Sequence, residues 1–405
     1  MKKVAIYIIG YAIIFLFLNP VRAQNQDVKI LEVTKEDMNG ALSPLSALAT
    51  KIQYIKLETT PDCLIGEVNH YRVLAFDKGF VIYHGLGEGE ILLFGADGSF
   101  ITKIGRKGKG PGEYSASYQV YYNDYSNQLL VLNRDKILTY NLNGKFVNTI
   151  KVPESYTARS VLIYDNKSLM LTYHRPAAQK SFETGILWID NLGNLMKIFN
   201  LSNPSVLGND LGFSEYNRIF RYDGEYYYSM YNHLSYFRFT DRNSWLRAFE
   251  ILTPVKPVSI DLITQIQNSY QSGIPALNEY IRDNGMVRST ILRSGFLWIY
   301  FTNKSPNVVL DYKNHKVFRW SSDPVFKAPG IVNDIDGGPP VNPAIFFGED
   351  KTVELLDVTQ LLGYKEKGLL SRNIGTKPGS SALVDLLKKT KPDDNPIIRI
   401  VTLKN

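Results

Sequence analysis

The chain has 405 residues and a single cysteine, Cys63, so it forms no intramolecular disulfide and its stability must come from buried apolar side chains. Lysine and arginine number 46 against 39 aspartates and glutamates, which gives a formal net charge of +7. This mild excess, spread over a long chain, argues against a dedicated nucleic-acid-binding protein, which usually carries a basic stripe or a recognisable module.

Residues 1–23 have the features of a secretory signal peptide. An apolar run over residues 4–18 follows two lysines, and Pro20 and the small-residue site ending at Ala23 come next. The run is shorter than the about 20 residues that a membrane-spanning helix needs. We therefore predict cleavage after Ala23 rather than an uncleaved anchor, and an exported protein that is periplasmic or extracellular. Cleavage removes three basic residues and no acid, so the net charge falls to +4.

Three similar segments recur further along the chain, each an apolar run, a turn with glycine and a second alternating run. They begin at Ile91, Ile137 and Ile186, so the spacing is in the forties. Strand patterns that repeat at this period are typical of propeller blades with about four strands each. The shared turn position is held by Gly98, Gly144 and Gly193.

Short segments rich in Val, Ile, Tyr, Phe and Leu predict five complete blades. These are Glu67–Ile104, Tyr118–Val152, Arg159–Leu201, Tyr216–Leu252 and Val287–Trp320. A sixth blade needs strands from both ends of the chain, because an open ring would leave unpaired strand edges. Its predicted strands are Ile331–Ile335, Ala344–Gly348, Pro396–Leu403 and, outermost, Ile52–Leu57.

The predicted fold is therefore all-β: a six-bladed β-propeller over residues 52–405, closed by exchange of an N-terminal strand, after an N-terminal extension over residues 24–51. Two segments interrupt the strands. Ser259–Asn284 predicts two short helices inserted between the fourth and fifth blades, with Gly273 ending the first and Pro275 starting the second. Ser381–Lys389 predicts a third helix inside the sixth blade.

Three motifs carry a family resemblance: LETTPDCLIGEV at residues 57–68, GRKGKGPGEY at 105–114 and DDNPIIRIVTLK at 393–404. With them the chain resembles the six-bladed β-propeller proteins of Bacteroidetes, a secreted family with repeats similar to NHL repeats. The resemblance implies the propeller fold and an exported location. It supplies no catalytic residues, because the family has no settled biochemical role. Many relatives also carry a lipid-attachment cysteine, which this chain lacks.

The loop over residues 105–114 is not a nucleotide-binding loop, because Gly110 is followed by Pro111 rather than by Lys and Ser or Thr. Two interpretations stay open. In the first, glycines adopt positive φ angles where the chain crosses between blades; these are Gly105, Gly108, Gly110 and Gly112. In the second, three cations and the backbone amides form an anion-binding lip, while two further residues dock onto neighbouring loops. The cations are Arg106, Lys107 and Lys109, and the docking residues are Glu113 and Tyr114.

Four polar residues fall just past the second strands of the first four predicted blades: His84, Arg134, His174 and His233. In a propeller these positions and the crossover loops lie at the same end of the channel. The three histidines could converge on a divalent metal, since a zinc site needs three protein ligands. Alternatively, all four are polar loop residues bonded to backbone. Asp334 and Asp336 lack the other positions of a calcium loop and are not interpreted as a site.

Two functions from different classes remain. The first is an exported, non-enzymatic binding or scaffold propeller that holds a protein, peptide or glycan partner on its crossover-loop face. The alternative is a metal-assisted hydrolase or lyase that uses His84, His174 and His233. For the first function we expect no cofactor, no nucleic acid and no membrane span after signal cleavage, and a monomer. The principal binding surface should be centred on the four residues that follow the second strands.

Overall fold

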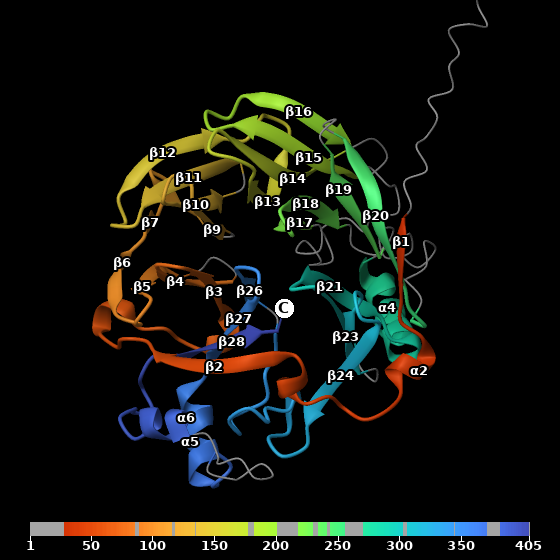
Figure 1. The fold of residues 1–405 in the computed structure, drawn as a ribbon. Coiled ribbons are helices and arrows are strands. Elements are labelled where there is room, and N and C mark those ends of the chain that lie inside the picture. The colour runs from red at the N-terminus through yellow and green to blue at the C-terminus, as the bar shows by residue number, and fades with distance from the viewer. Residues whose placement is uncertain are drawn as a thin grey trace, which may run out of the picture.

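The computed structural model describes residues 28–85, 89–115, 118–133, 135–176, 182–200, 218–229, 234–240, 244–255, 270–302, 306–343, 345–370 and 381–404. The predicted signal peptide lies outside the described residues. Figure 1 shows six sheets arranged around a central channel, so the chain is a six-bladed β-propeller, as predicted. None of the helices in the described ranges is long and apolar enough to cross a membrane.

The first three blades are four-stranded antiparallel sheets whose strands run in chain order from the channel outward. The first contains β3 (Tyr71–Phe76), β4 (Gly79–His84), β5 (Ile91–Gly95) and β6 (Phe100–Lys103). The second contains β9 (Gln119–Asn123), β10 (Gln128–Asn133), β11 (Lys136–Asn141) and β12 (Phe146–Lys151). The third contains β13 (Thr157–Ile163), β14 (Ser168–Pro176), β15 (Phe182–Asp190) and β16 (Leu195–Asn200).

The repeated glycines occupy the turn between the third and fourth strands of these blades, as predicted. Their φ angles are +88° at Gly98, +77° at Gly144 and +90° at Gly193, a region that residues with a Cβ rarely adopt. A Cβ at any of the three would also collide with a carbonyl oxygen at the outer edge of the preceding blade. The glycine therefore lets each turn pack directly against its neighbour.

The fourth and fifth blades each carry an additional strand. The fourth contains β17 (Arg218–Tyr222), β18 (Glu225–Ser229), β19 (Ser235–Phe239) and β20 (Trp245–Leu252), with β1 (Lys29–Glu32) parallel to β20. The fifth contains β21 (Val287–Arg293), β22 (Phe296–Phe301), β23 (Asn307–Asp311), β24 (Lys316–Asp323) and β25 (Ala328–Gly330). Strand β1 was not predicted from the sequence.

The sixth blade is built from both ends of the chain. From the channel outward it contains β26 (Ile345–Phe347), β27 (Lys351–Leu356), β28 (Ile397–Leu403) and β2 (Ala49–Lys56). The predicted closure by an N-terminal outermost strand is confirmed. The prediction of an inner strand at Ile331–Ile335 is wrong, and β27 was missed. Only Ile331 makes a bridge, to Val341, because the Asn333 side chain accepts hydrogen bonds from two following amides and turns the chain.

Between its two strands the N-terminal segment passes along the outside of the fifth blade, through α2 (Lys35–Met38) and the 3-10 helix η1 (Leu45–Ala47). The Ser43 amide donates to the carbonyl of Arg319 at 2.7 Å, and the Asp334 carboxylate accepts from the Ser46 amide at 2.7 Å. Residues 28–57 therefore contact three consecutive blades.

Two of the family motifs meet where the first and last blades join. After β2 the chain forms η2 (Pro61–Cys63) and η3 (Val68–His70). The Asn395 side chain, which is buried, donates to the carbonyls of Glu58 and Cys63 at 2.7 and 2.8 Å and accepts from the Ile65 amide at 2.8 Å. The motifs at residues 57–68 and 393–404 are therefore joined by hydrogen bonds where the sixth blade meets the first.

Apolar side chains fill each junction between neighbouring blades, so the core is a ring of six clusters around the channel. A seventh cluster holds two helices of the sixth blade, α5 (Val358–Glu366) and α6 (Ser381–Leu387), against Phe326. Helix α6 confirms the predicted helix at Ser381–Lys389, whereas α5 was not predicted.

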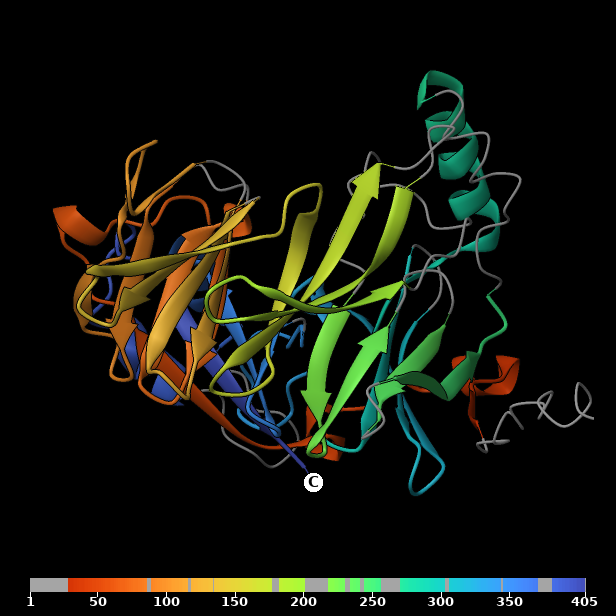
Figure 2. The ribbon, with the colours of Figure 1, turned by 90° about the horizontal axis from the view of Figure 1, so that it is seen from above.

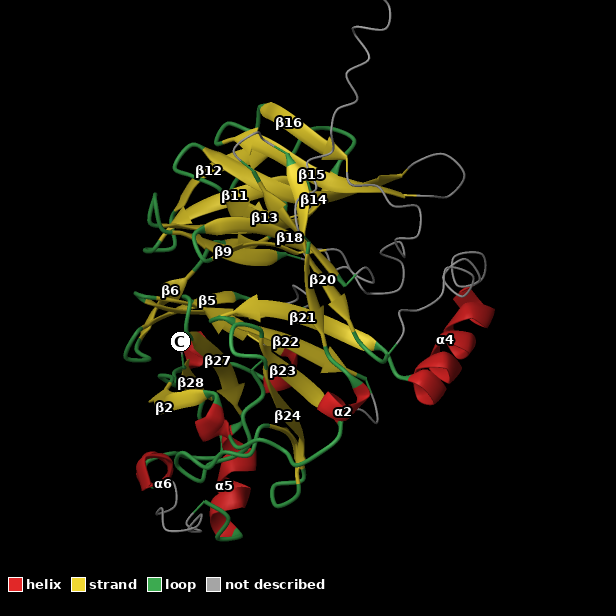
Figure 3. Cartoon of the chain, turned by 45° about the vertical axis from the view of Figure 1, so that its right-hand side comes forward, coloured by secondary structure: helices red, strands yellow, loops and turns green. Residues whose placement is uncertain are grey.

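The insertion between the fourth and fifth blades contains α4 (Tyr270–Asn284), a single helix of 15 residues. It runs through Gly273 and Pro275, so the prediction that one helix ends and another begins there is wrong. Pro275 removes one backbone hydrogen bond near the N-terminal end of the helix. The rest of the insertion, residues 256–269, lies outside the described residues. Figures 2 and 3 show α4 projecting from one face of the ring, away from α5 and α6 and from the C-terminus.

Candidate functional site

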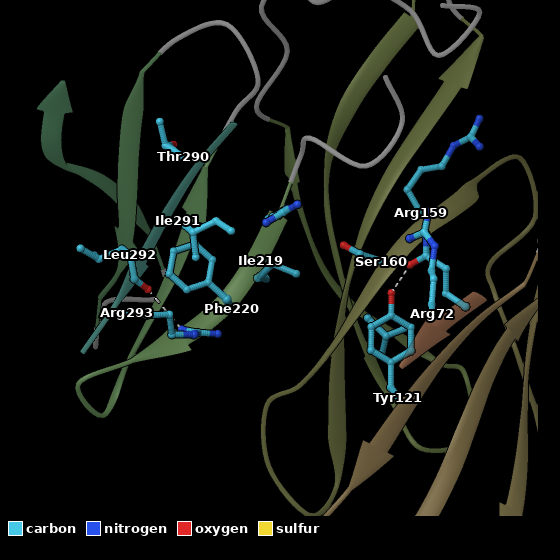
Figure 4. Close-up of a pocket in the computed structure, with 13 residues that line it drawn as sticks. Arg72, Tyr121, Arg159, Ser160, Ile219, Phe220, Thr290, Ile291, Leu292 and Arg293 are labelled. Atoms are coloured by element: carbon cyan, nitrogen blue, oxygen red, sulfur yellow. Dashed lines mark hydrogen bonds between the residues drawn. The ribbon is translucent and has the colours of Figure 1, made fainter. Parts of the chain in front are cut away.

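A cavity of about 250 Å³ lies in the central channel and is lined by the innermost strands of five blades (Figure 4). One lining residue comes from β3, two from β9, three each from β13 and β17, and four from β21. Four of them are arginines: Arg72, Arg159, Arg218 and Arg293. The described lining residues include no aspartate or glutamate. The wall of the channel is therefore strongly cationic at this level.

Three of the arginines lie near the crossover end, the end at which the chain crosses from the outermost strand of one blade to the innermost strand of the next. Arg218 is the first residue of β17, Arg72 the second of β3 and Arg159 the third of β13. Arg293 is the last residue of β21 and lies at the opposite, hairpin end of its strand. The cavity thus begins near the crossover end and reaches down the fifth blade.

Arg293 is held in the wall rather than in solvent. Its Nη1 donates to the carbonyl of Arg221 at 2.7 Å, and its guanidinium lies 5.3 Å from the ring centroid of Phe220. Burial lowers the pKa of Arg293, although the nearby Glu349 carboxylate opposes that effect. Its Nε is buried and has no hydrogen-bond partner among the described residues. A partly buried cation in this position favours an anion in the cavity.

Tyr121 supplies the polar surface between the arginines of the first and third blades (Figure 4). Its hydroxyl donates to the Gln119 side chain at 2.5 Å. Burial raises the pKa of Tyr121, and the Arg72 charge acts in the opposite direction. The phenol therefore stays protonated at neutral pH and offers a neutral hydroxyl to the cavity.

The structure places two of the four predicted residues that follow the second strands. His84 ends β4 opposite Tyr71, and His174 lies near the end of β14 opposite Thr157, so both backbones are at the crossover end. The His84 ring lies 5.6 Å from the His70 ring and 5.5 Å from the Tyr71 ring. Arg134 and His233 fall outside the described residues, and the His174 side chain is not described. Convergence of the four side chains stays a prediction.

Metal binding by the histidines also stays a prediction. Within the ranges that the structure describes, no group of three or more His, Cys, Asp or Glu side chains is arranged to hold a metal ion. Asp334 and Asp336 have local structural roles. Asp334 accepts from the amide and hydroxyl of Ser46, and Asp336 accepts from the Asn333 side chain at 2.7 Å.

The glycine loop folds around one carboxylate. Its strands β7 (Arg106–Lys107) and β8 (Glu113–Tyr114) pair in parallel. Glu113 accepts from the Gly110 amide at 2.7 Å and from Arg106 Nε at 2.5 Å, and these two bonds lower the pKa of its carboxyl. Tyr114 is buried in the cluster between the first two blades. Glu113 and Tyr114 thus hold the loop in place, and Lys107 and Lys109 are exposed beside Arg106.

The four loop glycines are required for two different reasons. Gly105 and Gly112 have φ angles of +57° and +69°, as predicted. The prediction is wrong for Gly108 and Gly110, which do not have positive φ. At Gly108 a Cβ would overlap the Glu113 carboxylate, and at Gly110 it would lie 3.1 Å from the same group. These two glycines leave room for the carboxylate.

The channel arginines were missed by reasoning from the sequence. Each lies within an innermost strand, in the segments YRVLAF, TARSVLI, RIFRY and VRSTILR. Alignment of the innermost strands of the blades would have shown an arginine in four of six. The sequence reasoning concentrated on loops instead, because binding residues are more common there.

The fold and the site define a six-bladed β-propeller with a cationic cavity in its channel. The chain belongs to the family described as a domain of unknown function, DUF4934, whose model matches residues 28–402. No curated protein sequence matches it.

Among solved structures, a candidate exported protein from Bacteroides fragilis is 18% identical, with a TM-score of 0.69, over 93% of this chain and all of that one. This likeness shows the shared fold. A catalytically inactive virginiamycin B lyase from Staphylococcus aureus is 10% identical with a TM-score of 0.37, covering 87% of this chain and 99% of that one. The calcium-binding protein regucalcin from Agrobacterium tumefaciens is 9% identical, also with a TM-score of 0.37, covering 93% and 97%. TM-scores this low do not indicate a shared function.

Proposed function

We propose that the protein is an exported, non-enzymatic binding propeller that holds its ligand in the channel from the crossover end. The observation that supports this proposal is the channel cavity of about 250 Å³. Five blades contribute to its wall, and four arginines line it. Binding sites are usually concave and largely preformed, and here the walls are strands rather than loops. Export is supported by the signal-like residues 1–23.

The size of the cavity favours a small ligand, or one terminal group of a peptide or glycan, over a folded partner. Pockets for drug-sized ligands are about 300 to 1,000 Å³, so this cavity lies near the lower limit. The described lining residues include Ser160 and Thr290 but no histidine, cysteine or carboxylate, so the hydroxyls in the lining have no neighbouring general base among them. These features support binding rather than catalysis.

Native mass spectrometry tests the proposal directly, because it detects a bound ligand of any chemical class by its mass. The tagged full chain is produced in a Bacteroides host, purified without denaturant and compared with the variant Ile291→Trp, whose larger side chain would fill the cavity. Ile291 is a lining residue that Figure 4 shows directed toward the open space. We expect a bound small-molecule mass on the unmodified chain and its loss from the variant.

The matched control is Leu192→Trp, which adds the same ring far from the channel, because Leu192 is 78% exposed on an outer turn of the third blade. This variant should keep the bound mass. Melting temperatures of both variants show whether each is folded. A bound mass that persists in folded Ile291→Trp, or a chain that carries no ligand at all, would contradict a channel-binding function.

A further inference from the structure

The two sides of the channel cavity differ in chemistry (Figure 4). On one side, the first three blades present Arg72, Tyr121 and Arg159. On the other side, the fourth and fifth blades contribute Arg218 and Arg293 as well, but they also present the apolar side chains of Phe220 and Ile291. Both of these apolar side chains are only partly buried by the protein, so each leaves surface available to an occupant. A ligand that satisfies both sides must combine a polar head with an apolar body.

The polar side selects an anion. Guanidinium groups donate paired N–H bonds in a plane, which matches the two oxygens of a carboxylate, and bonds between charged partners are about twice as strong as neutral ones. Tyr121 adds a polar, uncharged hydroxyl whose proton is donated to Gln119. Arg218, which begins β17 on the opposite side of the cavity, adds a third positive charge near the crossover end.

The apolar side is rigid. The Phe220 ring stacks at 20° on Tyr227, with centroids 6.0 Å apart, and meets Tyr236 edge-on at 5.9 Å. The Arg293 guanidinium lies 5.3 Å from the same ring. The Tyr236 hydroxyl donates to Thr290, which ties this aromatic group to β21 at 2.8 Å. A preformed apolar surface binds an apolar group without first having to order its own side chains.

We propose that the cavity binds a small carboxylate with a compact apolar body, such as an arylalkanoate or the C-terminal residue of an apolar peptide. The carboxylate contacts Arg72 and Arg159, and the apolar body lies against Phe220 and Ile291. This assignment rests on the proposed channel-binding function and names the class of ligand for it.

Calorimetric titration of the purified full chain with four probes tests the assignment. The probes are 3-phenylpropionate, its neutral amide, acetate and inorganic phosphate. We expect 3-phenylpropionate to bind at least about tenfold more tightly than the amide, because the amide lacks the charge. We expect a similar advantage over acetate, which lacks the apolar body, since burial of a phenyl group removes a large apolar surface from water.

Two variants assign each half of the ligand to its side of the cavity. Arg159→Gln should weaken 3-phenylpropionate about tenfold and leave the amide unchanged. Phe220→Leu should weaken 3-phenylpropionate and leave acetate unchanged. The matched control is Arg247→Gln, because Arg247 is exposed on β20 and pairs with Glu250 outside the channel. Melting curves confirm that each variant is folded.

Three results would overturn the assignment: equal binding of the amide and the acid, tighter binding of phosphate than of 3-phenylpropionate, or no binding of any probe. Each of these results would contradict the ligand class alone. The channel-binding function is tested separately by native mass spectrometry, which detects a ligand of any class. Loss of binding in folded Arg247→Gln would equally show that the charge effect is not specific to the cavity.

Discussion

Deletion of residues 28–57 should abolish cooperative unfolding of the propeller rather than trim a flexible tail. The segment supplies the outermost strand of the sixth blade and an additional strand of the fourth. Its removal exposes the edges of β28 and β20. It also removes Ala49 and six larger buried apolar side chains from the core: Leu31, Val33, Leu45, Leu48, Ile55 and Leu57.

The expected effect is large relative to the stability of a folded protein. Burying one such side chain contributes about 1.5 to 3 kcal/mol, so six contribute roughly 10 kcal/mol. Net stabilities of folded proteins are about 5 to 15 kcal/mol. We therefore expect the truncated chain to lack a cooperative melting transition in circular dichroism or calorimetry.

Two shorter deletions serve as controls. Removal of residues 2–27 takes away only the segment before β1 and should leave the melting curve unchanged. Removal of residues 28–44 takes away β1 and α2 but keeps β2, and should lower the melting temperature without loss of cooperativity. A chain without residues 28–57 that melts like the unmodified protein would show that β2 does not close the ring.

Arg399→Met should destabilise the protein by about 3 to 5 kcal/mol, the typical cost of removing one partner from a buried ion pair. The Arg399 side chain is completely buried on β28. Its Nε donates to Glu354 at 2.5 Å, and its two terminal nitrogens donate to the carbonyls of Pro339 and Pro340, each at 2.5 Å. Methionine fills similar space but leaves the carboxylate and both carbonyls without their donor. Chemical denaturation measures the loss.

The matched control is Arg238→Met, which removes a partly exposed arginine from its pair with Glu225 at 3.0 Å. Exposed ion pairs contribute about 0 to 1 kcal/mol, so this change should be nearly neutral. The double variant Arg399→Met with Glu354→Gln should recover part of the loss, because no unpaired carboxylate then remains. Equal effects of Arg399→Met and Arg238→Met would show that the buried network does not support the sixth blade.

Much of the fold could be predicted from the sequence because its local signals agree. The glycines Gly98, Gly144 and Gly193 mark the same hairpin position in three blades, and each lies in that turn with a positive φ. The closing strand was predictable because an open ring leaves two edges unpaired. The strand β27 was missed because its sequence, KTVELL, is short and mixed in polarity. Strand β1 pairs only at one edge and has a single buried residue, Leu31, so its pattern is weak.

The candidate site could be predicted only in part. The topology places the crossover loop, the insertion and the ends of the second strands at one end of the channel. This shared location could be predicted from the order of the strands in each blade. The arginines were missed because an arginine in a strand is usually interpreted as a solvent-facing residue, although an alignment of the innermost strands shows an arginine in four of six blades. Arg72, Arg159, Arg218 and Arg293 become a group only when their four blades surround one axis. The contact between Asn395 and the chain around Cys63 likewise joins segments more than 300 residues apart.

The central claim is that the channel cavity holds a carboxylate with an apolar body. A crystal structure with 3-(4-bromophenyl)propionate tests it most directly, because the bromine is located by its anomalous scattering and the carboxylate by its density. We expect a bromine peak beside Phe220 and Ile291, with the carboxylate within hydrogen-bonding distance of Arg72 or Arg159. A peak only on the outer surface, or a carboxylate directed away from both arginines, would contradict it.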